Sequence, residues 1–312
     1  MRGDIKPERL GFTHCHEHLF VFRIEGVTLP ERLVIDSYEN TKAEVARFAE
    51  MGGGALVDAQ PFGSGRNSEL LQRLSEETGV AIIASTGLHK ESFYPVRFWS
   101  FDASVRDITD LFVSEIEEGM FLYDRFDPFR KRGKAKAGII KIATADQGLT
   151  PYYRKVFDAA AEAHRKTAAP ILTHTELSGF GGQQAHYLTE RGVDPARIII
   201  SHMDRKIHIE NNRECAKLGV YLEYDTIART KYHSDADEAE LIRRMILDGF
   251  SRQVVLGMDL TRDRCVSYGG GPGLGYIMSD FIPMLEELGI DPDDCARMTV
   301  ENPRHALCFM KH

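Results

Sequence analysis

The chain has 312 residues, of which 43% are hydrophobic, and its formal net charge is -8. This length allows one large hydrophobic core and excludes a small domain held together by disulfides. The acidic balance argues against a general nucleic-acid or anionic-membrane binder, although it leaves room for a local basic pocket.

Five cysteines are spread along the chain, and no two are close in sequence: Cys15, Cys215, Cys265, Cys295 and Cys308. Their odd number and their spacing indicate neither a disulfide framework nor a CxxC zinc site. The first residues lead into no apolar segment typical of a signal peptide, and no apolar run approaches the length of a membrane span. We therefore expect a cytoplasmic protein.

Short apolar segments alternate with amphipathic ones along the whole chain. Some are apolar on both faces, as at Ile198–Ile200, which is typical of parallel strands covered by helices. We predict eight strands, at Leu10–His14, Ala55–Gln60, Val80–Thr86, Ala137–Ala143, Pro170–His174, Arg197–His202, Val220–Asp225 and Val254–Asp259.

Helical patterns fill the gaps between these segments. Thr41 followed by Glu44 is a capping-box signal for a helix that runs to Met51, where Gly52–Gly54 end it. Further helices are predicted at Asn67–Thr78, Tyr152–Lys166, Gln183–Arg191, Asp235–Asp248 and Ile277–Leu288.

The alternation of strands and helices predicts an α/β fold, a (β/α)8 TIM barrel, rather than a sandwich. A doubly wound open sheet is the alternative, and no GxGxxG or Walker loop supports it. Without a linker or a break in composition, we expect residues 1–312 to form a single domain. Lys90–Lys136 should hold a loop over the barrel mouth plus the third helix, and Gly269–Gly273 a mobile connection or lid.

Histidines alternate with other residues at the end of the first predicted strand. His14, His16 and His18 should share one face, because alternate residues of a strand point the same way. Neutral imidazoles are good ligands for zinc and similar ions, and two of them two residues apart can bind one metal. A single histidine is usually an ordinary core residue, but three in this pattern favour a metal site.

More ligand-type residues stand where other strands should end. His174 closes the fifth strand, His202 the sixth and Asp259 the eighth. In a (β/α)8 barrel the active site assembles at the carboxyl ends of the strands. Four strands would therefore deliver metal-type ligands to one place.

Lys141 lies inside an apolar strand, where a charge is costly unless it is paired or neutralised. One interpretation is a buried ion pair with Asp58 or Asp259. The other is a carbamate formed with carbon dioxide, which turns the cation into an anion able to bridge two metals. The residues alone leave both interpretations open.

An ordered set of motifs resembles the phosphotriesterase family of the amidohydrolase superfamily, in its phosphotriesterase-like lactonase branch. The motifs are Gly11-Phe12-Thr13 before His16-Glu17-His18, Ala137–Lys141, Thr173-His174-Thr175, His202, Asp259 and Glu301-Asn302-Pro303. They occur in the family's order between residues 11 and about 304. The set is specific, although each motif alone is not.

The resemblance implies a binuclear metal centre. His16, His18 and Asp259 would bind the first metal, His174 and His202 the second, and carboxylated Lys141 would bridge both along with a hydroxide. Zinc is the expected ion, with manganese, cobalt and nickel as alternatives. Asp259 would be the catalytic residue that orients the hydroxide and carries its proton to the leaving group.

The remaining residues of this kind have ordinary explanations. His14 departs from the family pattern, and we expect a core histidine or a neighbour of the ligands that points inward below the metals. Cys15 should point away from the site as a packed thiol. His164, His186 and His208 are expected at the surface.

Positively charged residues follow several of the predicted strands. Lys231 follows the seventh strand and Arg262 and Arg264 the eighth, with Arg205-Lys206 after the sixth and His89-Lys90 after the third. Barrels often bind phosphate between the loops after strands seven and eight. We expect Lys231 and Arg262 to bind an anionic substrate, while solvated loop charge is the ordinary alternative. Phenols at the mouth could assist or merely pack: Tyr224, Tyr232 and Tyr268.

Three functions remain open on this basis. The leading hypothesis is a lactonase that opens an anionic, phosphorylated sugar lactone by attack of the metal-bridging hydroxide. The alternative is a phosphotriester or carboxylate ester hydrolase, and the third is a non-catalytic ligand-binding relative. A basic, polar pocket would favour lactones and an apolar one neutral triesters. A homodimer is compatible with the sequence, which does not specify the assembly.

Overall fold

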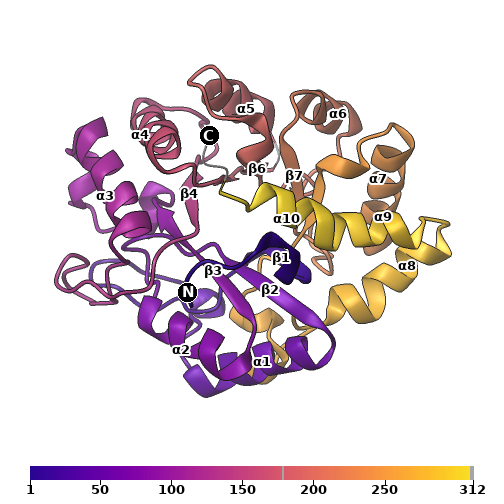
Figure 1. Cartoon of the computed structure of the whole chain (residues 1–312), viewed down its shortest axis with the longest axis horizontal. Coiled ribbons are helices and arrows are strands. Elements are labelled where there is room, and N and C mark those ends of the chain that lie inside the picture. The colour runs from indigo at the N-terminus through magenta and orange to yellow at the C-terminus, as the bar shows by residue number, and fades with distance from the viewer. Residues whose placement is uncertain (178, 310–312) are drawn as a thin grey trace.

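Eight parallel strands form a nearly closed barrel at the centre of the computed structural model, which describes residues 1–177 and 179–309 (Figure 1). Each strand pairs with the next along the chain, from first to last. This order confirms the predicted (β/α)8 barrel, because a doubly wound sheet reverses its strand order. The strands are β1 (Phe12–Glu17), β2 (Gly53–Asp58), β3 (Ala81–Gly87), β4 (Ile139–Ala143), β5 (Ile171–His174), β6 (Ile198–Ile200), β7 (Tyr221–Tyr224) and β8 (Val254–Leu256).

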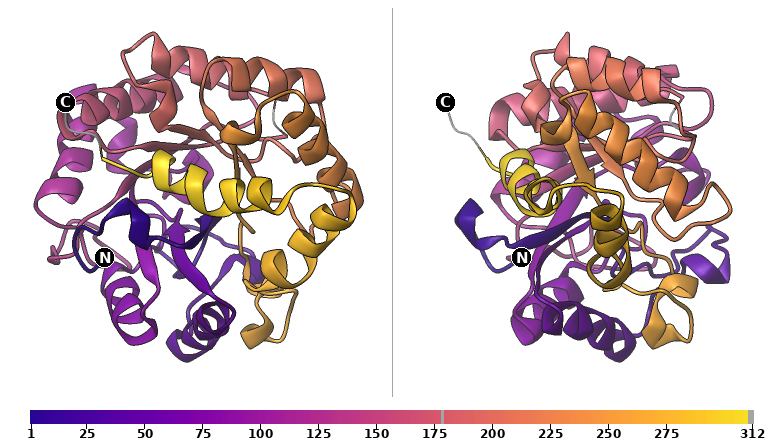
Figure 2. Two further views of the ribbon diagram at one scale, coloured as in Figure 1. Left: turned by 45° about the vertical axis from the view of Figure 1, so that its right-hand side comes forward. Right: turned by 90° about the vertical axis from the view of Figure 1, so that its right-hand side faces the viewer.

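Helices surround the barrel on its outer side, as both views in Figure 2 show. The predicted helix between Lys90 and Lys136 is α3, and α6 has no counterpart among the predictions. The helices are α1 (Tyr38–Glu50), α2 (Ser68–Thr78), α3 (Val105–Glu117), α4 (Pro151–Thr167), α5 (Gly181–Thr189), α6 (Ile209–Lys217), α7 (Asp235–Leu247), α8 (Ile282–Glu287), α9 (Pro292–Ala296) and α10 (Asn302–Ala306).

The first helix begins earlier than the sequence pattern predicts. Ser37 caps α1, because its hydroxyl accepts a hydrogen bond from the backbone N–H of Asn40 at 3.4 Å. Thr41 donates instead to the carbonyl of Leu19, and Glu44 accepts from the backbone N–H groups of Ser267 and Leu274. The predicted capping box is therefore wrong, and its two side chains anchor α1 to neighbouring loops, including both flanks of the predicted glycine-rich lid.

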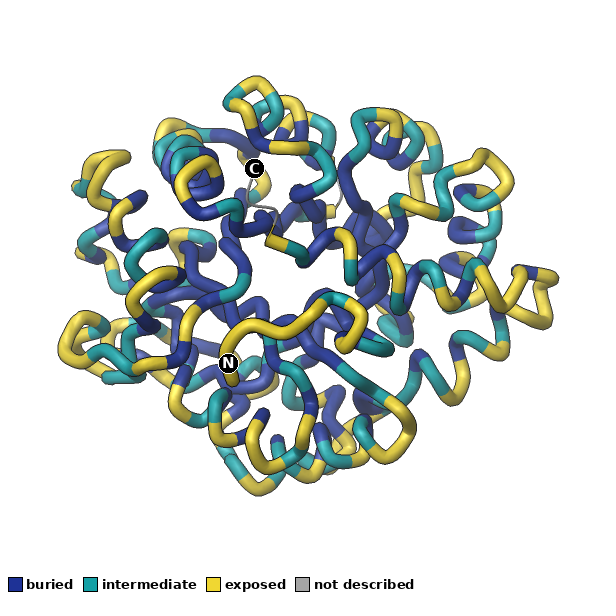
Figure 3. Tube along the Cα trace, viewed as in Figure 1, coloured by how far each residue is buried: buried dark blue, intermediate teal, exposed yellow. Residues whose placement is uncertain are grey.

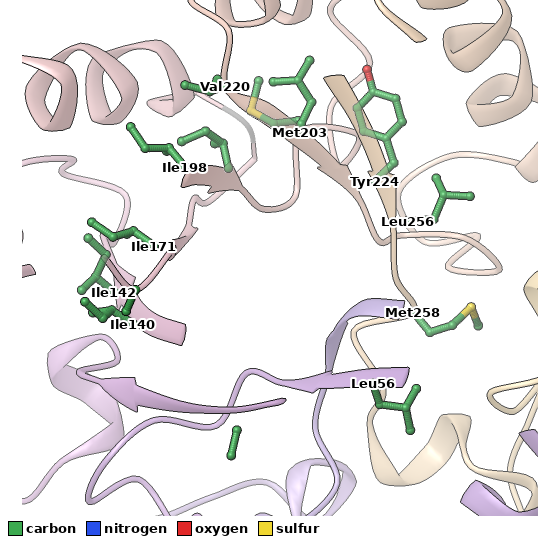
Figure 4. Close-up of a cluster of buried hydrophobic side chains, with 14 of the residues drawn as sticks. Leu56, Ile140, Ile142, Ile171, Ile198, Met203, Val220, Tyr224, Leu256 and Met258 are labelled. Atoms are coloured by element: carbon green, nitrogen blue, oxygen red, sulfur yellow. The ribbon is translucent and has the colours of Figure 1, made fainter. Parts of the chain in front are cut away.

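The hydrophobic core has two layers separated by the strands. Outward-facing side chains pack between the barrel and the helices, as Figure 4 shows for Leu56, Ile140, Ile171 and Leu256. Figure 3 shows that buried residues concentrate around the barrel and exposed ones in the peripheral turns. The inner layer fills the barrel with Cys15, Ala55, Val57, Ile139, Leu172, Ile199, Tyr221 and Val255.

The C-terminal helix covers the amino end of the barrel. The side-chain amide of Asn302 in α10 donates to the carbonyl oxygens of Val254, at the start of β8, and of Ser251, at 2.7 and 2.8 Å. The opposite end of the barrel therefore remains available for a site. Among the residues that the structure describes, no helix is both long and apolar enough to cross a membrane.

Candidate metal centre

A cavity of about 620 Å³ opens at the carboxyl ends of the strands. His18, His174 and Asp259, from the ends of three different strands, lie in its wall. Six cationic side chains and three carboxylates line it, so its polar surface has an excess of positive charge. These charged residues are Arg32, Lys90, Arg205, Arg229, Lys231, Arg264, Glu176, Asp259 and Asp263.

β1 breaks its own alternation before it reaches the cavity. Its pairing register with β2 shifts between His14 and Glu17, so His14 and His16 do not face the same side. His14 is fully buried against the ring of Phe48 in α1, with ring centroids 4.9 Å apart, and its Nδ1 lies 2.7 Å from Oε1 of Glu17. The expectation that His14 points into the barrel is therefore wrong, whereas its interpretation as a core histidine is confirmed.

Two further expectations are wrong, one about the direction of Cys15 and one about the exposure of His164. Cys15 is a packed thiol as expected, but the same register shift places it in the inner layer of the barrel core. His164 is buried rather than at the surface, because its Nδ1 bonds the carbonyl of Ala169 at 2.8 Å across the end of α4. His186 and His208 are exposed, as predicted.

His16, His18 and Asp259 form one group of ligand-type atoms. Nε2 of His16 and Nε2 of His18 lie 3.8 and 3.4 Å from Oδ1 of Asp259. The other ring nitrogen of His16, Nδ1, lies 2.8 Å from the Glu223 carboxylate. Because this carboxylate accepts a hydrogen bond from the Nδ1–H group, Nε2 carries no proton, and its lone pair faces Asp259. This group could hold a metal ion.

His174 and His202 meet beside the first group. Nδ1 of His174 lies 2.8 Å from Nε2 of His202, while Nε2 of His174 lies 3.1 Å from Glu176 and Nδ1 of His202 lies 2.7 Å from Asp225. The carboxylates accept hydrogen bonds from the outer ring N–H groups, so the two inner nitrogens face each other with lone pairs. Such a contact is repulsive unless a cation or a proton lies between the rings.

Burial keeps these imidazoles in the form that binds metal. Burial lowers the pKa of His16, His174 and His202 well below 6.5, and the nearby charges of Lys141, Lys90 and Arg205 respectively act in the same direction. A neutral imidazole is required of a metal ligand, because protonation removes the lone pair. The three rings therefore stay available as ligands at neutral pH.

Lys141 lies beside the first group. It is fully buried, and its Nζ is 3.4 Å from Nε2 of His16. It forms no ion pair with Asp58 or Asp259, so the buried-ion-pair interpretation receives no support. Burial lowers the pKa of Lys141 to about 8, against the opposing charges of Glu223, Asp225 and Asp259. The amine is therefore mostly protonated at pH 7, but its uncharged fraction is far larger than that of an ordinary lysine.

Asp259 is held in an unusual position by two arginines. Its Oδ2 lies 3.0 Å from Arg205 and 3.2 Å from Arg229. Burial alone would raise the pKa of Asp259, but Arg229 and the imidazoles of His18, His202 and His16 hold that pKa well below its ordinary value. Its backbone φ is +44°, a strained conformation that often marks functional sites.

Glu17 supports the backbone on both sides of Asp259. Its carboxylate accepts hydrogen bonds from the N–H groups of Met258 and Leu260, at 2.9 and 3.1 Å. The N–H of Asp259 itself donates to the carbonyl of His16 at 3.0 Å. Glu17, which lies between His16 and His18 in the sequence, thus fixes the residue with which these two histidines share a site.

Several functional side chains were not predicted. Glu223 and Asp225 orient His16 and His202, and Glu176 orients His174. The sequence does contain a signal for the first two, because they alternate at the end of a buried strand where carboxylates are costly. Nothing in the sequence pattern indicates that Arg229 contacts Asp259.

The predicted anion-binding residues lie in different surroundings. Lys231 lines the cavity, with its Nζ 4.6 Å from the centroid of the Tyr232 ring. The guanidinium of Arg262 lies 3.0 Å from the carbonyl of Val34 and 3.2 Å from Asp36, outside the residues that line the cavity. The structure thus brings Lys231, but not Arg262, to the cavity.

Other candidates at the mouth divide in the same way. Arg205, Arg264, His89 and Lys90 line the main cavity, and Lys206 lines a neighbouring one. Of the three phenols, Tyr232 lines the cavity. Tyr224 donates to Asn212 and Tyr268 to the carbonyl of Ser37, so both have packing roles.

Comparisons with known proteins agree with this geometry. The model of the phosphotriesterase family matches residues 1–307. The chain is 32% identical over 294 residues to the phosphotriesterase homology protein of Escherichia coli, covering 94% of this chain and 96% of that protein. It is also 32% identical over 324 residues to a phospho-furanose lactonase of Mycoplasmopsis synoviae, covering 98% of this chain and 90% of the other.

A solved structure extends the likeness to three dimensions. The crystal structure of the Escherichia coli phosphotriesterase homology protein, complexed with phosphate in its active site, superposes with a TM-score of 0.88 at 30% identity. The match covers 96% of this chain and 99% of that one. The family predicted from the sequence motifs is thereby confirmed.

Proposed function

Because the chain belongs to the phosphotriesterase family, a family of hydrolases that act on ester bonds, we propose that it opens an anionic, phosphorylated sugar lactone. The observation that carries the proposal is the combination of facing imidazole lone pairs at the cavity floor with an excess of cations on its walls. A neutral triester carries no negative charge with which these cations could interact.

The residues at the floor fit a pair of divalent metal ions. His16, His18 and Asp259 would bind one ion, His174 and His202 the other, and carboxylated Lys141 would bridge both. The contact between His174 and His202 supports this proposal, since a cation would relieve the repulsion between their lone pairs. Zinc is the ion we expect, and manganese, cobalt and nickel also suit the ligand set.

Lys141 suits carboxylation because its amine is buried and its pKa is lowered to about 8. The uncharged Nζ would attack carbon dioxide, forming an N–C bond and releasing one proton. The resulting carbamate would replace a buried cation with an anionic ligand for the metal ions, which are the positive partners that the imidazoles need. This exchange removes the cost of an unpaired buried ammonium group.

The metals, when bound, would lower the pKa of a water molecule and polarise the lactone carbonyl. Asp259 would accept a proton from the attacking water and pass it to the ring oxygen as the C–O bond breaks. Arg205 and Arg229 on its Oδ2 keep the carboxylate ionised, so that it holds the proton only in transit. Arg205 and Arg229 thereby act as positioning residues.

Lys231 would bind the substrate's phosphate. It lines the cavity, and no carboxylate in the described part of the chain forms an ion pair with it. Arg262 would be a second phosphate ligand, and it would first have to leave Val34 and Asp36. The solved relative with phosphate in its active site and the relative named as a phospho-furanose lactonase support an anion of this kind.

The test is metal analysis of the purified protein followed by hydrolysis of a lactone panel. Each lactone is supplied with and without a phosphate group, alongside a neutral phosphotriester. We expect the phosphorylated lactones to have the highest kcat/KM. Equal or better turnover of the neutral lactones would contradict the phosphate site, and preference for the triester would contradict the lactone assignment itself.

A further inference from the structure

A second group of ligand-type side chains lies outside the centre described above. Asp204 follows β6, His233 lies in the loop after β7, and Glu238 is in the first turns of α7. One ligand atom from each lies within 4.8 Å of the other two. Asp204 and Glu238 are fully buried, and the His233 side chain is 8% exposed.

The carboxylates of this group lack the donors that buried acceptors require. Both oxygens of Glu238 and Oδ1 of Asp204 have no hydrogen-bond partner among the described residues, and only Oδ2 of Asp204 accepts, from the N–H of Thr226 at 2.6 Å. Buried polar atoms are nearly always satisfied in native proteins. Three orphaned oxygens beside one another therefore indicate a missing positive partner.

His233 presents a lone pair to the same point. Its Nδ1 lies 3.0 Å from the carbonyl of Ser234, which can only accept, so Nδ1 carries the proton. Nε2 is then the acceptor nitrogen, 3.9 Å from Oε2 of Glu238 and 3.0 Å from the hydroxyl of Thr226. A ring N–H bound to a backbone carbonyl is the usual support of a metal-binding imidazole.

We propose that Asp204, His233 and Glu238 bind a structural divalent cation, with the Thr226 hydroxyl as a fourth ligand. Nε2 of His233 lies 3.9 Å from Oε2 of Glu238 and 3.0 Å from the Thr226 hydroxyl, and two ligands that each lie about 2.0–2.2 Å from one ion are at most about 4.4 Å apart. One imidazole with several oxygens suits zinc or manganese. A neighbouring cavity of about 490 Å³, in whose wall His233 lies, provides an entry path.

The site would tie the cavity wall to the barrel. The loop between Thr226 and His233 contains Arg229, which contacts Asp259, and Lys231, which lines the main cavity. A cation held by residues of three different elements would fix both ends of this loop. Its role is therefore structural, and it does not depend on the proposed lactonase activity.

The competing state is a proton shared by the two carboxyl groups. Burial and the neighbouring Asp204 raise the pKa of Glu238 well above its ordinary value, so the pair can hold a proton where no cation is bound. Metal binding would displace this proton, as it does at other carboxylate sites. The two states differ in scattering and in the number of bound metal ions.

Anomalous diffraction from crystals of the full-length protein grown with Mn²⁺ tests the proposal. We expect a peak between Nε2 of His233 and the oxygens of Asp204 and Glu238, separate from any peak at His16 and His18. Absence of this peak, with the Asp204 and Glu238 oxygens at hydrogen-bond distance, would overturn the proposal. The location of each peak distinguishes failure of this site from failure of the centre at the cavity floor.

Substitution gives an independent measurement in solution. We expect Glu238→Gln to bind one Mn²⁺ per chain fewer than the wild type, whereas Glu240→Gln, on the same helix and paired with Arg243 and Arg244, binds the same number. Equal losses in both variants would contradict the site. If Glu238→Gln does not fold, His233→Gln in the loop takes its place, and full Mn²⁺ binding by that variant would overturn the proposal.

Discussion

At the floor of the cavity a buried carboxylate fixes each of two ligand-type imidazoles, whereas the two predicted anion-binding residues contact an aromatic ring and an exposed carboxylate. The pairs His16–Glu223 and His202–Asp225 are at most 1% exposed. At the rim, Lys231 lies over the ring of Tyr232, and outside the cavity lining the side chains of Arg262 and Asp36 are 32% and 46% exposed. The floor is thus built before any ligand arrives, while the rim can rearrange around one.

This difference indicates that the two regions have separate roles in catalysis and in substrate binding. Buried, oriented ligands hold the geometry that hydrolysis requires, because misplaced catalytic groups lose much of their effect. Exposed charges select the substrate, since they interact with it at little structural cost. Substitutions at the floor should therefore affect turnover and metal content, and substitutions at the rim should affect substrate affinity.

The largest effect is expected for Lys141→Ala. Loss of the proposed bridging ligand should lower kcat/KM by about a thousandfold or more, because a metal centre supplies several kcal/mol of transition-state stabilisation. Metal content should fall in parallel, as measured by mass spectrometry. Lys217→Ala, at the exposed end of α6, is the control. Labelled bicarbonate should add a carbamate carbon signal to the wild type and to Lys217→Ala but not to Lys141→Ala, and full activity of the wild type without that signal would contradict carboxylation.

The next effect should separate a fully buried carboxylate from a partly exposed one. We expect Asp225→Asn to weaken metal binding by about 10–100-fold, because loss of an orienting partner typically has that cost. Glu176→Gln should have a smaller effect, since Glu176 is 24% exposed and water can replace it. Metal titration followed by calorimetry measures both. Equal losses would contradict the distinction between a fully buried and a partly exposed orienting carboxylate.

At the rim, Lys231→Ala should raise KM for a phosphorylated lactone by about tenfold or more with little change in kcat, because a hydrogen bond to a charged group is worth about 1.5–3 kcal/mol. Arg262→Ala should raise KM less, since its guanidinium already contacts Val34 and Asp36. Steady-state kinetics with matched neutral lactones provides the control. An equal rise in KM for the neutral lactones would contradict the role of Lys231.

The last effect is on stability rather than on activity, and it concerns the metal-free protein and pH. His16, His174 and His202 stay neutral in the folded protein because burial lowers their pKa values, but they bind protons when it unfolds. Stability should therefore fall as the pH drops below about 6.5, by at most about 1.4 kcal/mol per imidazole per pH unit. Tm measured between pH 8 and 5 tests this. His186→Gln, at an exposed position, should leave the slope unchanged.

The sequence predicted the fold and the residues at the floor because both depend on regular periodicity. His174, His202 and Asp259 lie at strand ends that hydrophobic patterns locate well. The register shift in β1 could not be predicted in this way, because it reverses the alternation on which the orientation of His14 and Cys15 was based. The contacts of the loops could not be predicted either, since the position of Arg262 depends on Asp36, which is distant in sequence.

The junction between the first and last strands has one more consequence. Glu17 and His16 hold the backbone around Asp259, so the contacts that close the ring also align ligand-type residues from its two ends. Local unfolding at this junction would separate those residues and open the barrel in a single event. Hydrogen exchange at the amides of Met258 and Leu260 should therefore report the lifetime of the assembled centre.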